Sequence, residues 1–360
     1  MSAFRGLHFG PLWPGPALAL GSALLFGAST PLAKLLLGVV DPWMLAALLY
    51  LGSGTGLFVV QVAARRLAPA AWRGTSLRGR DWSWFGGAVL AGGVAGPLLL
   101  MAGLARTSAA TASLLLNLEG VATALLAWFV FRENFDRRIA TGMAAVVAGA
   151  AVLSWQAAPS LSGFAGPLLV AAACAAWGLD NNLTRKVSLS DPVRIAMLKG
   201  LIAGAVNLGL ALWHGDALPA LGVAAVGGVL GLFGYGVSIA LFVVALRHLG
   251  AARTGAYFGT APFVGAVIAV LGLGEAVTTG LVLAGALMAL GVWLHLTERH
   301  EHEHAHGSMA HDHRHRHDSH HRHVHAPGDP PGEPHAHRHV HAGQSHSHGH
   351  TPDAHHDHAH

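Results

Sequence analysis

Residues 104–133 have the sequence LARTSAATASLLLNLEGVATALLAWFVFRE, and residues 246–275 have the sequence LRHLGAARTGAYFGTAPFVGAVIAVLGLGE. The two stretches align without a gap at a constant offset of 142 positions, and both end on glutamate, Glu133 and Glu275. An apolar pattern that occurs twice in one chain is typical of transporters built from two structural repeats. The alignment therefore predicts a membrane protein with two related halves.

The repeat extends toward the N-terminal side of both stretches. An aromatic-glycine pair followed by Asp-Pro occurs as Phe26-Gly27 with Asp41-Pro42, and again as Trp177-Gly178 with Asp191-Pro192. These motifs predict a first repeat over residues 14–156 and a second over residues 163–296, preceded by a short segment, 1–13, and followed by a tail, 297–360.

The composition places the two repeats in lipid. Hydrophobic residues make up 52% of the chain and charged residues 11%, and the mean hydropathy is +0.47. A soluble domain carries about 25% charged residues, and a membrane-spanning helix needs roughly 20 apolar residues. Ten apolar runs meet this need, near 14–37, 41–63, 82–104, 107–130, 138–156, 164–187, 192–213, 219–245, 252–273 and 277–296.

The charged residues between these runs predict the orientation. Five spans in each copy force the second copy to cross the membrane in the opposite sense, which gives an inverted repeat. With a cytoplasmic N-terminus, the inner segments hold nearly all Arg and Lys residues, whereas the outer segments hold little beyond Lys34 and Arg106. We therefore expect a multi-pass protein of the inner or plasma membrane with both termini in the cytoplasm.

The tail has a different composition from the rest of the chain. Residues 300–360 contain 23 of the 27 histidines and few residues able to build a core. Such a segment is expected to be disordered. Imidazole is a common ligand of nickel, cobalt, zinc and copper, so the tail predicts metal binding without a required cofactor. The candidate ligands alternate with other residues: His300, His302, His304, His306, His311, His313, His315, His317, His335, His337, His339 and His341.

One motif in the tail resembles an enzyme signature. His300-Glu301-His302-Glu303-His304 fits the H-E-x-x-H pattern of zinc proteases. That chemistry requires a helix beside a substrate cleft, and in a histidine-saturated segment the match is expected by chance. The spans contain no catalytic constellation, so we do not expect an enzyme.

The acids within the apolar runs are the candidate transport residues. Glu119 lies near the middle of the fourth run, two residues after Asn117. An ionised carboxylate in lipid costs at least about 2.5 kcal/mol, so Glu119 must be protonated, paired or facing a polar cavity. We expect it to couple protons or bind a cation; the structural alternative is a protonated Glu that bonds two helices.

A second polar group lies in the sixth run. Asp180, Asn181 and Asn182 are consecutive, and Lys199 follows in the seventh run. Polar residues where two antiparallel repeats meet are the expected lining of a central cavity. The alternative for Lys199 is an interfacial position reached by its long side chain.

The order of these motifs resembles the EamA branch of the drug/metabolite transporter superfamily. The resemblance covers residues 14–296 and rests on the aromatic-glycine pairs, the Asp-Pro pairs and the glutamates that close the fourth span. It implies ten helices in two inverted five-helix halves, a central cavity and proton-linked or exchange-driven export of small metabolites. The family pattern implies a proline in the fourth span and a basic residue in the second span of each half. The second half has Pro262 and Lys199 at these positions, but the first half has Gly120 and Leu49, so we expect an asymmetric cavity.

The leading hypothesis is secondary active efflux of a small solute, with transition metals or metal chelates favoured by the tail. The sequence supports almost equally well an exporter of amino acids or other organic metabolites with a metal-binding tail. A membrane-anchored metal buffer or sensor is the alternative from another class. The expected partners are the lipid bilayer, the transported solute and coupled protons; nucleic acid is not expected, and homodimer formation stays open.

Overall fold

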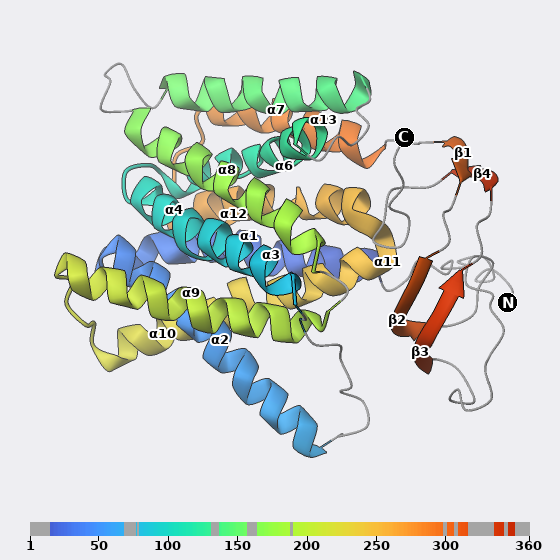
Figure 1. Ribbon diagram of the computed structural model, residues 1–360. Coiled ribbons are helices and arrows are strands. Elements are labelled where there is room, and N and C mark those ends of the chain that lie inside the picture. The colour runs from blue at the N-terminus through green and yellow to red at the C-terminus, as the bar shows by residue number, and fades with distance from the viewer. Residues whose placement is uncertain are drawn as a thin grey trace, which may run out of the picture.

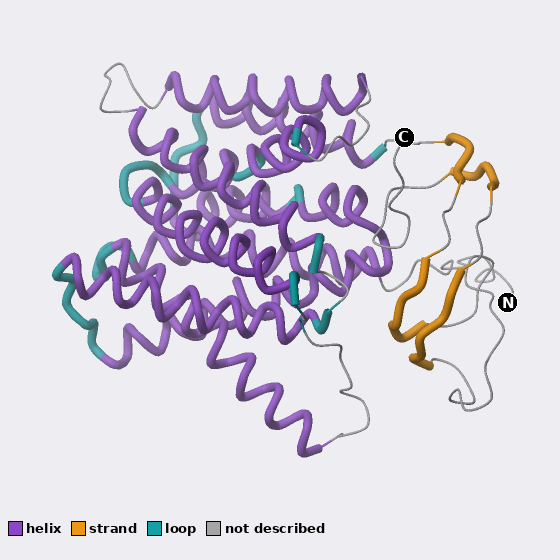
Figure 2. Tube along the Cα trace, in the orientation of Figure 1, coloured by secondary structure: helices purple, strands orange, loops and turns teal. Residues whose placement is uncertain are grey.

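The computed structural model describes residues 15–67, 77, 79–130, 137–156, 164–187, 190–297, 301–305, 309–315, 335–341 and 345–349. The described residues before 298 form a body of helices that lie side by side, and short strands follow at one end of this body (Figure 1). Figure 2 shows how little of the described body lies outside helices.

The first half contains seven α-helices and one π-helical segment among its described residues. A single helical path runs through α3, η2 and α4, with the π-helical turn η2 in its middle. The next path is broken between α5 and α6. The bounds are α1 (Gly15–Leu36), α2 (Pro42–Leu67), α3 (Asp81–Ala88), η2 (Val89–Ala95), α4 (Gly96–Leu104), α5 (Ala109–Leu115), α6 (Leu118–Phe129) and α7 (Arg137–Gln156).

The second half repeats this plan. Its third helical path again contains a π-helical turn, η4, and its fourth path again breaks, between α11 and α12. The bounds are α8 (Ala165–Arg185), α9 (Pro192–His214), α10 (Leu221–Gly231), η4 (Leu232–Val237), α11 (Ser238–Phe258), α12 (Ala261–Leu273) and α13 (Thr279–Leu296).

Local sequence explains several helix ends. Asp191 caps α9 by accepting bonds from the backbone N–H groups of Val193 (3.0 Å) and Arg194 (3.3 Å), and Pro192 occupies the first helical position, where no donor is needed. Gly215 ends α9 with a φ of 96°, a left-handed conformation that glycine adopts without a steric penalty.

Each predicted apolar run coincides with a helical segment, with one shifted boundary. Within the part of the chain that the structure describes, six helical paths are long and apolar enough to cross a membrane, and three shorter apolar helices lie at Ala140–Trp155, Ala261–Leu273 and Thr279–Leu294. The predicted gap between runs 219–245 and 252–273 is wrong, because α11 continues through residues 246–251. In the first half Ser108 caps a new helix at this point, whereas its counterpart Gly250 has no side chain to do so.

The largest helix contacts join the two halves. α2 packs against α9 and α7 against α13, while α1 packs against α11 and α12, and α8 packs against α4 and α6. α2 and α9 meet at glycine: a Cβ atom on Gly54 would lie 2.3 Å from the backbone nitrogen of Leu201, and one on Gly200 would lie 2.5 Å from that of Gly54. Such close approach is how helices associate in lipid.

The tail differs from its sequence-based prediction. Disorder is predicted for residues 297–360, but the described part forms four strands, β1 (Glu301–Ala305), β2 (Met309–His315), β3 (His335–His341) and β4 (Ser345–Gly349). β1 pairs with β4, and β2 pairs with β3, both antiparallel. The alternation of histidine with other residues has a period of two, which is the period of a strand.

Candidate functional site

The break in the fourth helical path places polar groups inside the bundle. α5 ends at Leu115, and α6 begins at Leu118, so that Glu119 lies in the first turn of α6. The second half breaks at the equivalent point, between Phe258 and Ala261. Interrupted helices are a common way to build a solute site in a transporter, because their ends leave backbone groups available.

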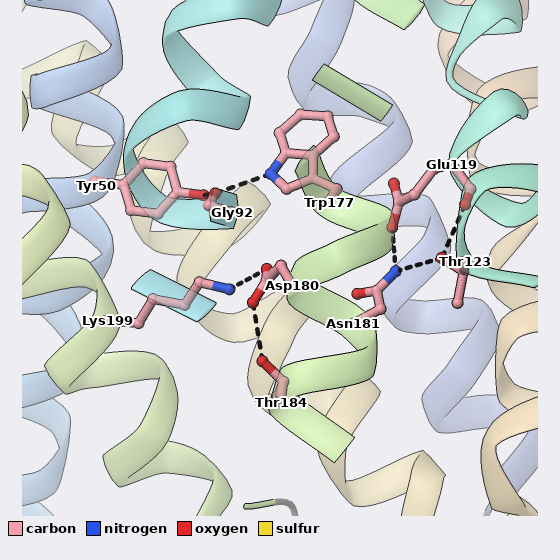
Figure 3. A network of polar contacts seen from close by, with 9 residues as sticks. All are labelled: Tyr50, Gly92, Glu119, Thr123, Trp177, Asp180, Asn181, Thr184 and Lys199. Atoms are coloured by element: carbon pink, nitrogen blue, oxygen red, sulfur yellow. Dashed lines mark hydrogen bonds and ion pairs between the residues drawn. The ribbon is translucent and has the colours of Figure 1, made fainter. Parts of the chain in front are cut away.

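Glu119 is joined to the other half of the chain by an amide. The Nδ2 group of Asn181 on α8 donates to Glu119 Oε1 (2.8 Å) and to Thr123 Oγ1 (3.2 Å). Thr123 in turn donates to the backbone carbonyl of Glu119 (2.8 Å). Figure 3 shows Asn181 pointing from α8 toward Glu119 and Thr123, so the contact links α6 to α8.

Asp180 points away from Glu119 toward a cation. Its carboxylate forms an ion pair with Lys199 on α9 and accepts a bond from Thr184 Oγ1 (2.9 Å), as Figure 3 shows. Asp180 and Lys199 are each only 5% exposed. A buried charge of this kind is tolerated when it is paired and hydrogen-bonded, which is the case for Asp180.

The π-helical turn η2 supplies an acceptor beside this pair. The carbonyl oxygen of Gly92 accepts bonds from Tyr50 Oη (2.6 Å) and from Trp177 Nε1 (2.9 Å). A Cβ atom at Gly92 would lie 1.9 Å from Asp180 Oδ2, so only glycine fits against this carboxylate. π-Helical turns are rare and often occur at functional sites. Gly92 therefore joins α2, α8 and η2 around Asp180.

Aromatic rings surround the polar groups. The ring of Phe26 on α1 lies 6.0 Å from that of Trp177, 5.8 Å from that of Tyr235 and 5.2 Å from that of Phe258, measured between centroids. Tyr50 and Tyr235 are also adjacent, at 5.3 Å. The rings come from both halves and form an apolar wall beside the charged pair.

The structure brings together four of the six predicted transport residues, Glu119, Asn181, Asp180 and Lys199, as two adjacent polar clusters (Figure 3). Asn182 supports them by donating to the carbonyl oxygens of Gly178 (2.9 Å) and Thr123 (3.1 Å). Asn117 faces another way: its amide donates to Leu114 O (3.0 Å) and contacts the sulfur of Met288 on α13 (3.7 Å).

Sequence reasoning missed several members of the site. Tyr50, Gly92, Thr123, Trp177 and Thr184 all bond to the predicted residues or to their neighbours. The repeated aromatic-glycine pair contains Trp177 and could have indicated it. Gly92 lies in a glycine-rich stretch that predicts helix packing, and its contact with Asp180 depends on the tertiary fold.

The predicted metal ligands lie in the tail. Nine of them lie in the described strands, whereas His300, His306 and His317 lie outside the described residues. Glu133, which closes the first aligned stretch, also lies outside them. Within the residues the structure describes, no group of three or more His, Cys, Asp or Glu side chains could hold a metal ion. The helical site is therefore a site of hydrogen bonds and one ion pair.

Comparison with known proteins agrees with this architecture. The model of the EamA-like transporter family matches residues 13–155 and again 164–297. An uncharacterized transporter of Methanothermobacter thermautotrophicus is 29% identical over 309 residues, which cover 81% of this chain and 88% of that protein. A solved crystal structure with 18% identity has a TM-score of 0.59 over 78% of this chain and 94% of its own, which shows a shared fold. The chain is a multi-pass membrane protein that belongs to the EamA-like transporter family.

Proposed function

We propose that this protein is a proton-coupled exporter of a small polar organic solute, built from ten membrane spans in two inverted halves. The observation that carries the proposal is the polar network between the halves, in which Glu119 of the first half meets Asn181 of the second. Ionisable residues within membrane helices mark transport pathways by default, because lipid offers them no solvation. A site shared by two inverted halves can be opened to either side when one half rocks against the other.

The two acids have different partners, and this difference assigns their roles. Asp180 has Lys199 as a cationic partner, so its charge is balanced in the buried site. Glu119 has the neutral amide of Asn181 at its carboxylate and is only partly buried. A carboxylate held by a neutral donor can gain or lose a proton without breaking an ion pair. Glu119 is the proton carrier in this proposal, and the Asp180–Lys199 pair is a fixed polar surface for the solute.

The donor set favours an organic solute over a bare metal ion. Amide, hydroxyl and carboxylate groups beside aromatic rings are typical of sites that bind small organic molecules. A bare transition metal would call for a cluster of histidine, cysteine or carboxylate ligands, which the described helices do not form. A chelated metal remains compatible with the site. An amino acid is one solute class that fits, since it can bond to both acids and amides.

The proposal includes an orientation in which the tail lies on the cytoplasmic side. The connections α4–α5 and α9–α10 lie at one end of the helices, and strands β1–β4 lie at the other (Figure 1). The positive-inside rule predicts that the Arg-rich segments of the sequence are cytoplasmic, so the proposal has both termini in the cytoplasm. This arrangement gives the tail access to the cytoplasmic mouth of the transporter.

The experiment compares solute contents of cells that express the full-length protein, a chain ending at Thr297, Glu119→Gln or an empty vector. Amino acids and other metabolites are measured by mass spectrometry, and nickel, cobalt, zinc and copper by plasma emission. The proposal expects the full-length protein to lower at least one organic solute, and Glu119→Gln to abolish this. A lower content of a metal alone, independent of any chelator, would contradict the organic-solute proposal.

We also propose that the tail binds transition metals through its strand pairs, because the register sets histidine opposite histidine. The opposed pairs are His302 with His348 and His304 with His346 in β1–β4, and His311 with His339, His313 with His337 and His315 with His335 in β2–β3. Opposed residues of an antiparallel pair share one face of the sheet. Histidines on a common face suit joint coordination of nickel, copper or zinc.

A one-residue insertion tests whether metal binding depends on the strand register or only on the number of histidines. Insertion of glycine after Asp312 keeps every histidine but moves His313 and His315 to the other face of the pair, since the period of a strand is two. Nickel titration of the full-length protein should show weaker binding for this variant than for one with glycine inserted between β2 and β3. Equal binding by both variants would show that composition alone determines metal affinity.

A further inference from the structure

A carboxylate from the second half caps a helix of the first half. Glu275 follows α12, and its Oε1 and Oε2 atoms accept bonds from the backbone N–H groups of Ala109 (2.7 Å) and Ala110 (2.8 Å). These residues begin α5, whose first N–H groups have no partner within the helix. Bonds from backbone N–H groups to an ionised carboxylate are stronger than bonds between neutral groups.

The position of Glu275 is fixed by the end of its own helix. Gly274 has a φ of 69°, a left-handed conformation that turns the chain out of α12. The backbone nitrogen of Glu275 then bonds to the carbonyl oxygen of Ala269 (3.3 Å). This cap holds the carboxylate against α5 instead of leaving it on a freely moving connection.

A cation ties a third helix to the same end. Lys34, in the last turn of α1, donates from Nζ to the carbonyl oxygens of Leu104 (2.5 Å) and Thr107 (2.8 Å) in the connection before α5. Deeper in the bundle, Ser113 of α5 packs on Gly265 of α12, where an added Cβ would lie 2.6 Å from Ser113 Oγ. The three helices α1, α5 and α12 are thus joined from their ends inward.

The equivalent contact at the other end cannot form in this conformation. The counterparts of Ala109 and Ala110 are Ala251 and Ala252, which lie inside the continuous helix α11. Their N–H groups are used by the helix, so no carboxylate can cap them. Among the described residues, the carboxylate cap is therefore present at the start of α5, whereas the equivalent residues of the second half lie within a continuous helix.

We propose that the contact of Glu275 with the first turn of α5 is a latch that holds this end of the transporter shut and is released once in each transport cycle. Lys34 supports the latch by holding the α4–α5 connection in place. The inference rests on the proposed function, since a latch has a use only if the two ends open alternately. It assigns Glu275 a gating role distinct from the proton transfer of Glu119 and the solute contacts of Asp180.

The test measures how fast a buried thiol reacts when the latch is weakened. A reporter is made by Ser113→Cys in a Cys174→Ala background of the full-length protein, since Ser113 is fully buried between α5 and α12. Glu275→Gln keeps the size of the side chain but removes its charge. Reaction of the reporter with a water-soluble maleimide should become about tenfold faster, in line with the loss of charge-assisted hydrogen bonds. Lys34→Met should accelerate it less.

Asp216→Asn is the matched control, because Asp216 lies at the same end of the bundle but bonds to His214. It should leave the maleimide rate unchanged. An unchanged rate in Glu275→Gln, in protein that elutes as a single folded species, would overturn the latch. If Glu275→Gln does not fold, hydrogen exchange of Ala109 and Ala110 is compared between Glu275→Asp and wild type; equal protection would likewise overturn it. These readouts need no solute, so their outcome is independent of the transport test with Glu119→Gln.

Discussion

The two halves of this protein share a scaffold but differ in chemistry. Both have a π-helical turn in the third helical path and a break in the fourth, at matching points of the repeat. At the first break stands Glu119, bonded to Asn181, whereas the equivalent residue at the second break is Ala261, followed by Pro262. Conversely, Lys199 and its partner Asp180 occur only in the second half, and Leu49 occupies the position equivalent to Lys199.

The two repeats therefore share their backbone features but differ in their buried polar side chains. A break and a π-helical turn are features of the backbone, and both copies have them at matching points of the repeat. Charges in lipid are costly, so few buried charged residues are expected and the halves need not repeat them. The Glu119–Asn181 contact joins the two halves, whereas the Asp180–Lys199 pair lies within the second half.

The largest effect expected from breaking this asymmetry is on stability, through Lys199→Met. Removal of the cation gives the second half an apolar residue, like Leu49 in the first, but leaves Asp180 buried without its partner. Loss of one member of a buried pair costs about 3–5 kcal/mol. Thermal unfolding of the purified protein in detergent should therefore shift strongly downward.

The double variant Lys199→Met with Asp180→Asn provides the control. It removes both charges, so most of the lost stability should return. A melting temperature equally low in the single and the double variants would show that packing of the Lys199 side chain, instead of its charge, stabilises the site.

A smaller effect is expected when the link between the halves is cut. Asn181→Leu removes the donor to Glu119. A fully buried acceptor left without its donor costs about 1–3 kcal/mol, and the partly buried Glu119 should lie at the lower end of this range. The rate of proton-driven transport should fall about three- to tenfold per folded molecule. Asn182→Leu is the comparison, since Asn182 bonds to the backbone of Gly178 and Thr123; it should lower stability more than rate. Equal rates in the two variants would contradict a special role for Asn181.

The smallest effect is expected at Gly92, whose carbonyl has two donors. Trp177→Phe leaves Tyr50 as a donor, so the free energy of unfolding should fall by about 1 kcal/mol. Tyr50→Phe should behave alike. The pair of substitutions removes both donors, and its cost should exceed the sum of the single costs, because only then is the carbonyl unsatisfied. Additive losses in denaturant unfolding would argue against a shared acceptor.

Much of the fold could be predicted from the sequence because helix periodicity and repetition are local signals. The aligned stretches 104–133 and 246–275 indicate the duplication, and the family match confirms it. The exact break points are less accessible: α11 continues through residues 246–251 because its copy lacks the cap that Ser108 gives α5. Strand pairing in the tail was missed, since composition predicts disorder without regard to the period of the histidines.

The site was partly predictable for a related physical reason. Charged residues within apolar runs are conspicuous, so Glu119, Asp180 and Lys199 could be named without a structure. Partners that use backbone groups or uncharged side chains are not conspicuous. The acceptor at Gly92 exists because η2 departs from the α-helix, and the turn of Asn117 toward Met288 depends on how α5 packs. Neither can be predicted from residue type alone.

The most direct test of the account is net transport against exchange in proteoliposomes that contain wild type or Glu119→Gln. The solute is the one identified from cell contents, and labelled solute is measured with a pH gradient or with unlabelled solute on the opposite side. If Glu119 carries the coupled proton, Glu119→Gln loses pH-driven accumulation by more than about tenfold but retains exchange. Accumulation at the wild-type rate by Glu119→Gln would contradict the account.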